Sequence, residues 1–244
     1  MNRELKEFST DPQWQNKSKI LIVGAHPDDE NLIAWGAINY LIEAGIPITV
    51  LTLTLGELGE TKDKPDIPPV EMGKLRENEF YSSNNARGLQ GYMMKFPDTG
   101  LNRADIMEQA KNETLEFVRE NNFGAIFSFH PFEITPEFDH LDHNAAGEIA
   151  RYVGAFSAVK NLHTKSAPLE NRPSLYLWTS NPGFATHHIL FSPEIEADRK
   201  MHLANYYPSQ FPKDSMSRWG VIFDGISRGM RGDLPSREMF MKVR

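Results

Sequence analysis

The sequence predicts a three-layer, Rossmann-like α/β fold with a mostly parallel sheet. Short apolar runs alternate along the chain with longer segments of helical periodicity, which is typical of a sheet covered by helices on both faces. Histidines and acidic residues follow directly after two of the apolar runs. In a parallel sheet, ligands bind beyond the carboxyl ends of the strands, so we expect the active site at that edge.

Strands and helices alternate in the first half of the chain. The predicted strands are residues 19–25 (KILIVGA), 46–56 (IPITVLTLTLG) and 92–96 (YMMKF). The predicted helices are residues 30–45, which stop at Gly45, and about 74–88. Residues 56–73 are rich in glycine, proline and charge, and this composition predicts a loop.

The alternation continues in the second half. The predicted helices are residues 103–121, 140 to about 160, and 193–207. The predicted strands are residues 124–130 (GAIFSFH) and 174–180 (SLYLWTS). The last 35 or so residues are rich in Gly, Pro and Arg and show weak periodicity, so we expect a less regular structure there.

Composition excludes several classes of protein. The 244-residue chain has no cysteine, which excludes disulfides and thiolate metal sites. Its net charge of −7 argues against general attraction to nucleic acid or to anionic lipid. No apolar run approaches the roughly 18 residues that cross a bilayer, and the polar start lacks the apolar core of a signal peptide. We therefore expect a soluble cytoplasmic protein.

The first candidate site motif is AHPDDE, residues 25–30, at the end of the first predicted strand. Pro27 suits the first turn of a helix, and Asp28 and Asp29 would lie at the positive end of the helix dipole. The two acids could merely cap a helix, but capping alone requires neither His26 nor two adjacent acids. Because His26 and Asp29 are three residues apart across a strand-to-helix turn, they can converge on one metal ion.

The second motif is HLDH, residues 140–143, which follows another apolar strand. His140 and His143 share one face of a helix start, so one can bind a metal while the other faces the substrate. Two histidines, one carboxylate and an open position form the usual pattern of a catalytic zinc site. The same donors suit iron, cobalt or manganese. Asp28 would then be available to take a proton from the attacking water as general base.

These motifs resemble the LmbE/PIG-L family of zinc-dependent N-deacetylases, which act mostly on N-acetylglucosamine conjugates. The resemblance includes TLGELG (54–59), RENE (76–79) and PDTGL (97–101), and extends over residues 19–147. It implies that the metal ligands are His26, Asp29 and His143. It further implies that Asp28 is the general base.

The resemblance assigns roles to further residues. His140 would assist the tetrahedral intermediate as a charged hydrogen-bond donor or acid, and Asp142 would support one of the histidines. The residues that hold or border the sugar would be Glu57, Arg76 and Asp98. For two of these the residues leave another interpretation open, since Arg76 and Glu79 could form an intrahelical ion pair and Asp98 could start a turn.

Several positions depart from the family pattern. Trp35-Gly36 stands where two small residues are usual, and Arg87-Gly88 replaces a common Leu-Gly. The segment YPSQ (207–210) stands where many members have a histidine before Ser-Gln. We interpret His130 as a residue that fixes a loop, while His187 and His188 could reach the pocket or lie in a strand. Trp178, Phe132 and Phe184 could stack on sugar rings, but core packing is the expectation for each.

The sequence therefore predicts a zinc-dependent N-deacetylase that removes the acetyl group from the N-acetyl amine of a GlcNAc-type sugar conjugate. Fe²⁺ and Co²⁺ are alternative metals. The alternatives in function are another metallohydrolase, an amidase or esterase on a different small substrate, and a non-catalytic sugar- or metal-binding homologue. We expect one domain over residues 1–244, with a metal-site core at 19–147 and a substrate-shaping part at about 148–244. The expected partner is a small sugar conjugate, and a homo-oligomer is left open.

Overall fold

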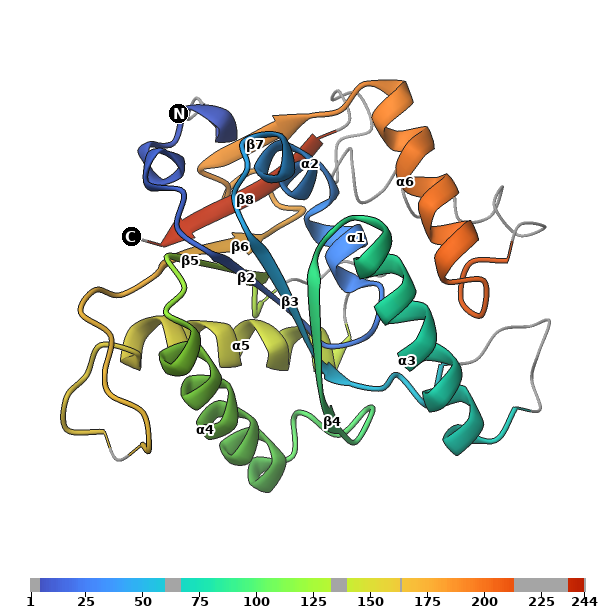
Figure 1. The fold of residues 1–244 in the computed structure, drawn as a ribbon, viewed down its shortest axis with the longest axis horizontal. Coiled ribbons are helices and arrows are strands. Elements are labelled where there is room, and N and C mark those ends of the chain that lie inside the picture. The colour runs from blue at the N-terminus through green and yellow to red at the C-terminus, as the bar shows by residue number, and fades with distance from the viewer. Residues whose placement is uncertain (1–4, 60–66, 133–139, 163, 213–236, 244) are drawn as a thin grey trace.

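The computed structural model describes residues 5–59, 67–132, 140–162, 164–212 and 237–243 (Figure 1). These residues form an eight-stranded sheet with the order β1-β7-β8-β6-β5-β2-β3-β4 and with helices on both faces. The α/β fold class is confirmed. Part of the predicted 56–73 loop and most of the last 35 residues lie outside the described ranges.

Five parallel strands form a continuous block from β6 to the edge strand β4 and match the predicted strands. They are β2 (Ile20–Gly24), β3 (Ile48–Thr54), β4 (Gln90–Phe96), β5 (Ala125–Phe129) and β6 (Ser174–Trp178). The chain runs from β2 outward to β3 and β4, and then returns to the other side of β2 for β5 and β6. The switch point between β2 and β5 is the place where such sheets bind ligands.

The helices follow from the crossovers between these strands. They are α1 (Asp29–Ile33), α2 (Trp35–Glu43), α3 (Pro69–Ala86), α4 (Ala104–Asn121), α5 (Leu141–Phe156) and α6 (Pro193–Tyr206). Because parallel crossovers are right-handed, the reversal of direction after β4 places α4 and α5 on the face opposite α1 to α3. α5 packs on β2, β5 and β6, and α4 packs on α5.

Two predicted helices have different bounds in the structure. The helix expected over 30–45 is broken at Ala34, whose φ of −140° and ψ of 22° are not helical, so α1 and α2 are separate. α3 begins at Pro69 rather than near Lys74, because a proline at the first position fixes a helical φ without losing a hydrogen bond.

Three strands were not predicted as such. β1 (Lys6–Glu7) has two residues, β7 (His187–Leu190) has four, and β8 (Arg237–Val243) lies in the segment of weak periodicity. β8 is antiparallel to both β6 and β7, which makes the sheet mixed. Within the described ranges, no helix is long and apolar enough to span a membrane.

β8 also completes the start of α2. The N-cap residue Ala34 offers no side-chain oxygen to the first amides of the helix. The buried carboxylate of Glu238 supplies it, since it accepts hydrogen bonds from the N–H groups of Gly36 (2.9 Å) and Ala37 (3.1 Å). A carboxylate at this position also interacts favourably with the helix dipole.

We predict that Glu238→Ala lowers the free energy of unfolding by about 1–3 kcal/mol, because it leaves two buried amides of α2 without an acceptor. Urea titration followed by circular dichroism measures the change. Glu120→Ala on the exposed face of α4 is the control, with an expected change below about 0.5 kcal/mol. Equal stability of the wild-type protein and Glu238→Ala would contradict the capping role.

Candidate functional site

The predicted site residues come together at the carboxyl edge of the sheet. His26, Asp28 and Asp29 follow β2, Glu57 follows β3, and Asp98 follows β4. The start of α5, reached after β5, adds His140, Asp142 and His143. The turn after β2 therefore meets the start of α5 at the switch point of the sheet.

Asp29 fixes the turn that carries His26. Its Oδ2 accepts hydrogen bonds from the N–H groups of Ala25 (2.7 Å) and His26 (2.9 Å). Gly24 allows this close approach, because a Cβ there would lie 2.9 Å from the Asp29 Cβ. Burial alone would raise the pKa of Asp29, but the nearby His143 and His26 rings hold it well below its ordinary value. Asp29 is therefore an anion in the interior of the protein.

Three donor atoms converge beside this carboxylate. His143 Nε2 lies 3.2 Å from His26 Nδ1 and 3.2 Å from Asp29 Oδ1. Asp29 Oδ1 is buried and, among the residues that the structure describes, has no hydrogen-bond partner. Tetrahedral zinc with ligand bonds of 2.0–2.1 Å separates its ligands by roughly 3.3 Å. His26, Asp29 and His143 thus fit a divalent metal ion as they stand.

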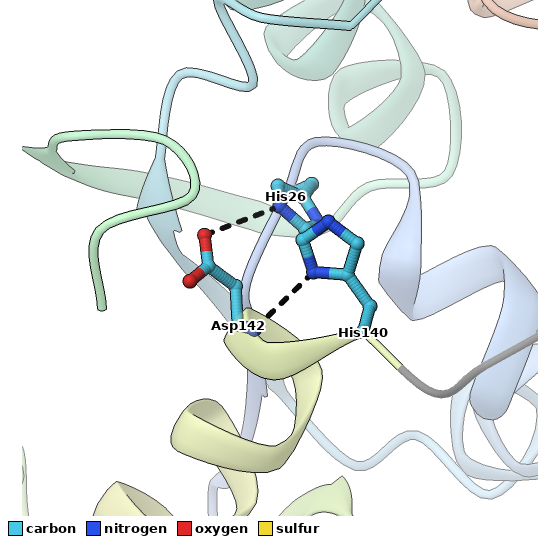
Figure 2. A group of neighbouring side chains, drawn as sticks. All are labelled: His26, His140 and Asp142. Atoms are coloured by element: carbon cyan, nitrogen blue, oxygen red, sulfur yellow. Dashed lines mark hydrogen bonds and ion pairs between the residues drawn. The ribbon is translucent and has the colours of Figure 1, made fainter. Parts of the chain in front are cut away.

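The other nitrogen of His26 faces two carboxylates. His26 Nε2 lies 3.1 Å from Asp98 Oδ1 and 3.7 Å from Asp142 Oδ2, and Figure 2 shows the Asp142 contact. Burial would lower the pKa of His26, but the interactions with Asp142 and Asp98 raise it to about 10. A carboxylate on the far nitrogen is the usual partner of a metal-binding histidine, because it fixes the ring and its tautomer.

His26, His140 and Asp142 form a second group whose spacing could hold a metal ion. His26 would have to use Nε2 in this group, on the side that already faces Asp98 and Asp142. Asp142 Oδ1 accepts a hydrogen bond from the Leu101 N–H (3.1 Å), and its Oδ2 is buried beside His26 Nε2 without a hydrogen bond in the described part of the chain. The group with Asp29 and His143 is therefore the better metal candidate.

His140 lies at the N-cap of α5, where its Nδ1 accepts a hydrogen bond from the Asp142 N–H (3.2 Å; Figure 2). Its ring meets the His26 ring edge-on, with the centroids 4.9 Å apart. Burial and the neighbouring histidines lower its pKa. Because Nδ1 is an acceptor, the neutral ring carries its proton on Nε2, which is then available as a donor.

Asp28 is buried and contacts Arg76, whose Nη2 lies 2.8 Å from Asp28 Oδ2. Burial raises the pKa of Asp28 to about 8, although the Arg76 charge acts in the opposite direction. Arg76 also donates hydrogen bonds to backbone carbonyls in the loops after β2 and β3. Glu79 accepts two hydrogen bonds from Ser209, one from its N–H and one from its hydroxyl. The sequence did not predict either contact.

The other two predicted sugar-contacting residues bond to the protein and to each other. Glu57 accepts a hydrogen bond from the Asp98 N–H (3.0 Å), and Asp98 Oδ2 accepts one from the Leu58 N–H (2.9 Å). Burial opposes ionisation of Asp98, but the contact with His26 holds its pKa at about 2. A sugar contact by Glu57, Arg76 or Asp98 stays a prediction.

The residues that depart from the family pattern contact one another or the site. The Arg87 guanidinium lies 3.9 Å from the Trp35 ring centroid, so the two unusual residues pack together. In the 207–210 segment, the Tyr207 hydroxyl donates to Glu30 (2.8 Å), the residue after Asp29. Sequence reasoning missed Glu30, although its place in AHPDDE was a signal.

The remaining aromatic and histidine residues divide into core and surface. Trp178 is buried as predicted, whereas Phe132 and Phe184 are exposed by 65% and 45%, so their expected core packing is wrong. His130 is buried, stacks on Phe184 with centroids 4.9 Å apart, and accepts a hydrogen bond from the Phe132 N–H. His187 lies in β7, 3.3 Å from Asp11 Oδ2.

Comparison with known proteins identifies relatives that are named as deacetylases. The chain is 31% identical over 136 residues to a probable N-acetyl-alpha-D-glucosaminyl L-malate deacetylase 2 of Bacillus anthracis. The match covers 55% of this chain and 58% of that protein, so the chain spans little more than half of the relative's length.

Two solved structures share the fold. N,N'-diacetylchitobiose deacetylase from Pyrococcus horikoshii has a TM-score of 0.79 at 21% identity, over 97% of this chain and 87% of that chain. GalB, the 4-carboxy-2-hydroxymuconate hydratase from Pseudomonas putida, has a TM-score of 0.69 at 16% identity, over 93% and 96% of the two chains. At these identities the likeness shows the fold alone.

The family match is more specific than the structural likeness. Residues 21–153, which include the turn after β2 and most of α5, match the family described as PIG-L, GlcNAc-PI de-N-acetylase. Since this match covers more than half of the chain, the protein belongs to the PIG-L family.

Proposed function

We propose that this protein is a zinc-dependent N-deacetylase that removes the acetyl group from the N-acetyl amine of a GlcNAc-type sugar conjugate. One observation carries the proposal: His26 Nδ1, His143 Nε2 and Asp29 Oδ1 converge at the switch point, and Asp29 Oδ1 is buried without a hydrogen bond within the described ranges. The named activity of the Bacillus anthracis relative supports the reaction and the sugar.

His26, Asp29 and His143 would hold the metal, with Asp142 and Asp98 orienting His26. Two imidazole nitrogens and one carboxylate are a donor set of catalytic zinc sites that keep a position open. The same set accepts Fe²⁺ or Co²⁺, and we assign zinc because the donor spacing matches tetrahedral coordination. A divalent ion there would supply Lewis-acid chemistry by lowering the pKa of a water molecule and polarising the amide carbonyl.

Asp28 and His140 would carry the proton chemistry. Asp28 takes a proton from the attacking water as the water oxygen adds to the carbonyl carbon. His140 donates a hydrogen bond to the carbonyl oxygen while that oxygen becomes negative. The C–N bond then breaks, and the nitrogen leaves as the sugar amine with the proton that Asp28 had taken. The other product is acetic acid, whose remaining proton passes to the amine to give acetate and the ammonium form of the sugar.

Glu57 and Asp98 are proposed to border the sugar. Carboxylates accept hydrogen bonds from sugar hydroxyls, so an acidic border suits a neutral, hydroxyl-rich ligand. It also favours release of a cationic amine over binding of a polyanion. A cytoplasmic location and a single domain over residues 1–244 stay predictions.

The metal ligands are tested by replacing one of them. We expect His143→Ala to lose most of its zinc, because two donors hold the ion much less tightly than three, while circular dichroism shows an intact fold. Elemental analysis after loading with zinc and gel filtration measures the metal content. His188→Ala in β7 is the control and should keep full occupancy. Full occupancy in His143→Ala would contradict the ligand assignment.

The neighbouring acids are distinguished by a second pair of variants. Asp28→Asn should keep the metal and lose about 10²–10⁴-fold in kcat, because the amide cannot accept the proton of the water. Asparagine also tolerates the left-handed backbone of this residue. Asp29→Asn should lose both metal and activity. The roles are reversed if Asp28→Asn loses zinc while Asp29→Asn retains it.

The function itself is tested with the zinc-loaded protein and a panel of acetylated sugars. We expect release of a primary amine and acetate from N-acetylglucosamine glycosides and from N,N'-diacetylchitobiose. O-acetylated sugars without an N-acetyl group serve as the comparison. Cleavage of the esters alone would favour an esterase, and zinc binding without hydrolysis of any sugar would favour a binding protein.

A further inference from the structure

Arg76 is a buried cation whose two terminal nitrogens donate to the protein, while its buried Nε has no hydrogen-bond partner among the described residues. Its residue is 4% exposed, and it lies on the inner side of α3. Nη2 donates to the Pro27 carbonyl (2.5 Å) and to Asp28 Oδ2 (2.8 Å), and Nη1 donates to the Gly56 carbonyl (3.3 Å). The guanidinium thus joins the turn after β2 to the loop after β3.

The residue held by Arg76 has an unusual backbone. Asp28 has φ 107° and ψ −23°, in a region that residues with a side chain rarely adopt. Such a conformation costs about 1–3 kcal/mol and persists only where the surroundings enforce it. Arg76 contacts the Pro27 carbonyl, which belongs to the peptide plane before Asp28, and also the Asp28 carboxylate. These contacts hold the strained residue from both sides.

The loop after β3 is shaped around the same guanidinium. Gly56 has φ +62°, and a Cβ at this position would overlap Arg76 Nη1. A Cβ at Gly59 would lie 2.8 Å from the same nitrogen. The two glycines of GELG therefore leave the space that Arg76 fills. The backbone of this loop thus forms a pocket that fits the guanidinium, and the position of Arg76 does not depend on a bound ligand.

Arg76 occupies only one oxygen of Asp28. In the described part of the chain, Oδ1 of Asp28 accepts no hydrogen bond from the protein, while Oδ2 is bound by Arg76. A carboxylate that is fixed through one oxygen keeps the other in a defined direction. This arrangement suits a group that must meet a water molecule in a single geometry.

We propose that Arg76 is a positioning residue that acts through Asp28: it holds the strained Asp28 backbone and aims Oδ1 at the reacting water. The proposal rests on the proposed function, in which Asp28 is the general base. It gives Arg76 a different role from the sugar contact that the family resemblance implies. The two roles differ in the kinetic constant that they affect.

The kinetic test uses the zinc-loaded variants Arg76→Ala and Arg76→Lys with an N-acetylglucosaminide. We expect kcat to fall about 10–100-fold while KM stays within about twofold, because Asp28 is displaced and the sugar contacts remain. Lysine should restore little, since one ammonium cannot reproduce the forked contacts. Lys74→Ala on the exposed side of α3 removes a positive charge from the same helix and should leave both constants unchanged.

A double variant separates action through Asp28 from a general structural effect. In the Asp28→Asn background, Arg76→Ala should cause no further loss of kcat, since the group it positions no longer accepts a proton. Additive losses, or a raised KM with unchanged kcat, would overturn the proposal. Zinc content equal to that of the wild-type protein is expected in Arg76→Ala.

A crystal structure of Arg76→Ala gives a readout that does not depend on activity. We expect Asp28 to leave the left-handed region, with its carboxylate turned away from the metal group. An unchanged Asp28 would overturn the proposal even if kcat had fallen. If the wild-type protein hydrolysed no acetylated sugar, the proposed function would fail, while the conformation of Asp28 would still decide whether Arg76 holds it.

Discussion

The double hydrogen bond that Asp29 accepts from the N–H groups of Ala25 and His26 is the constraint on which the site depends. It uses one carboxylate oxygen to fix the turn after β2 and leaves the other beside His143. The direction of His26 follows from the same turn. A buried carboxylate would ordinarily be costly, but two amides and two histidines surround this one. The Asp29 carboxylate thus determines both the backbone conformation of this turn and the negative charge beside the histidines.

From this point outward, the site is a set of anions arranged around histidines. Asp98 and Asp142 face His26 from one side, and Asp29 faces His26 and His143 from the other. Phe129 stacks on His143 with centroids 4.2 Å apart, so the ring is held by packing as well as by charge. Such an interior is complementary to a small divalent cation, because the positive charge of the ion would offset the repulsion between the carboxylates.

The strands of the parallel sheet and the residues of the site could be predicted because both depend on short-range patterns. Buried strands are apolar runs, and AHPDDE and HLDH each follow one. The break at Ala34 and the strand β8 could not be predicted, since each depends on a partner far along the chain. Ala34 breaks the helix where Glu238 supplies the cap, and β8 is a strand because β6 and β7 flank it.

The same limit applied to Arg76 and to residues 207–210. Their sequence shows charge and turn chemistry, but only the folded chain shows that Arg76 meets Asp28 and that Tyr207 meets Glu30. Trp35 and Arg87 are an instructive pair, because each looked like an isolated departure. The cation–π contact between them makes the two departures one feature of the packing.

Because Glu238 caps α2, the ribosome synthesises this helix long before the residue that caps it. The capped amide of Gly36 and the carboxylate of Glu238 are 202 residues apart in the sequence. At typical rates of 5–20 residues per second, a ribosome needs roughly 10–40 s to cover that distance. For this time α2, which follows the turn with His26 and Asp29, has emerged with its first amides uncapped. The turn with His26 and Asp29 therefore emerges before the cap of α2, and α2 gains that cap only when residue 238 has been synthesised.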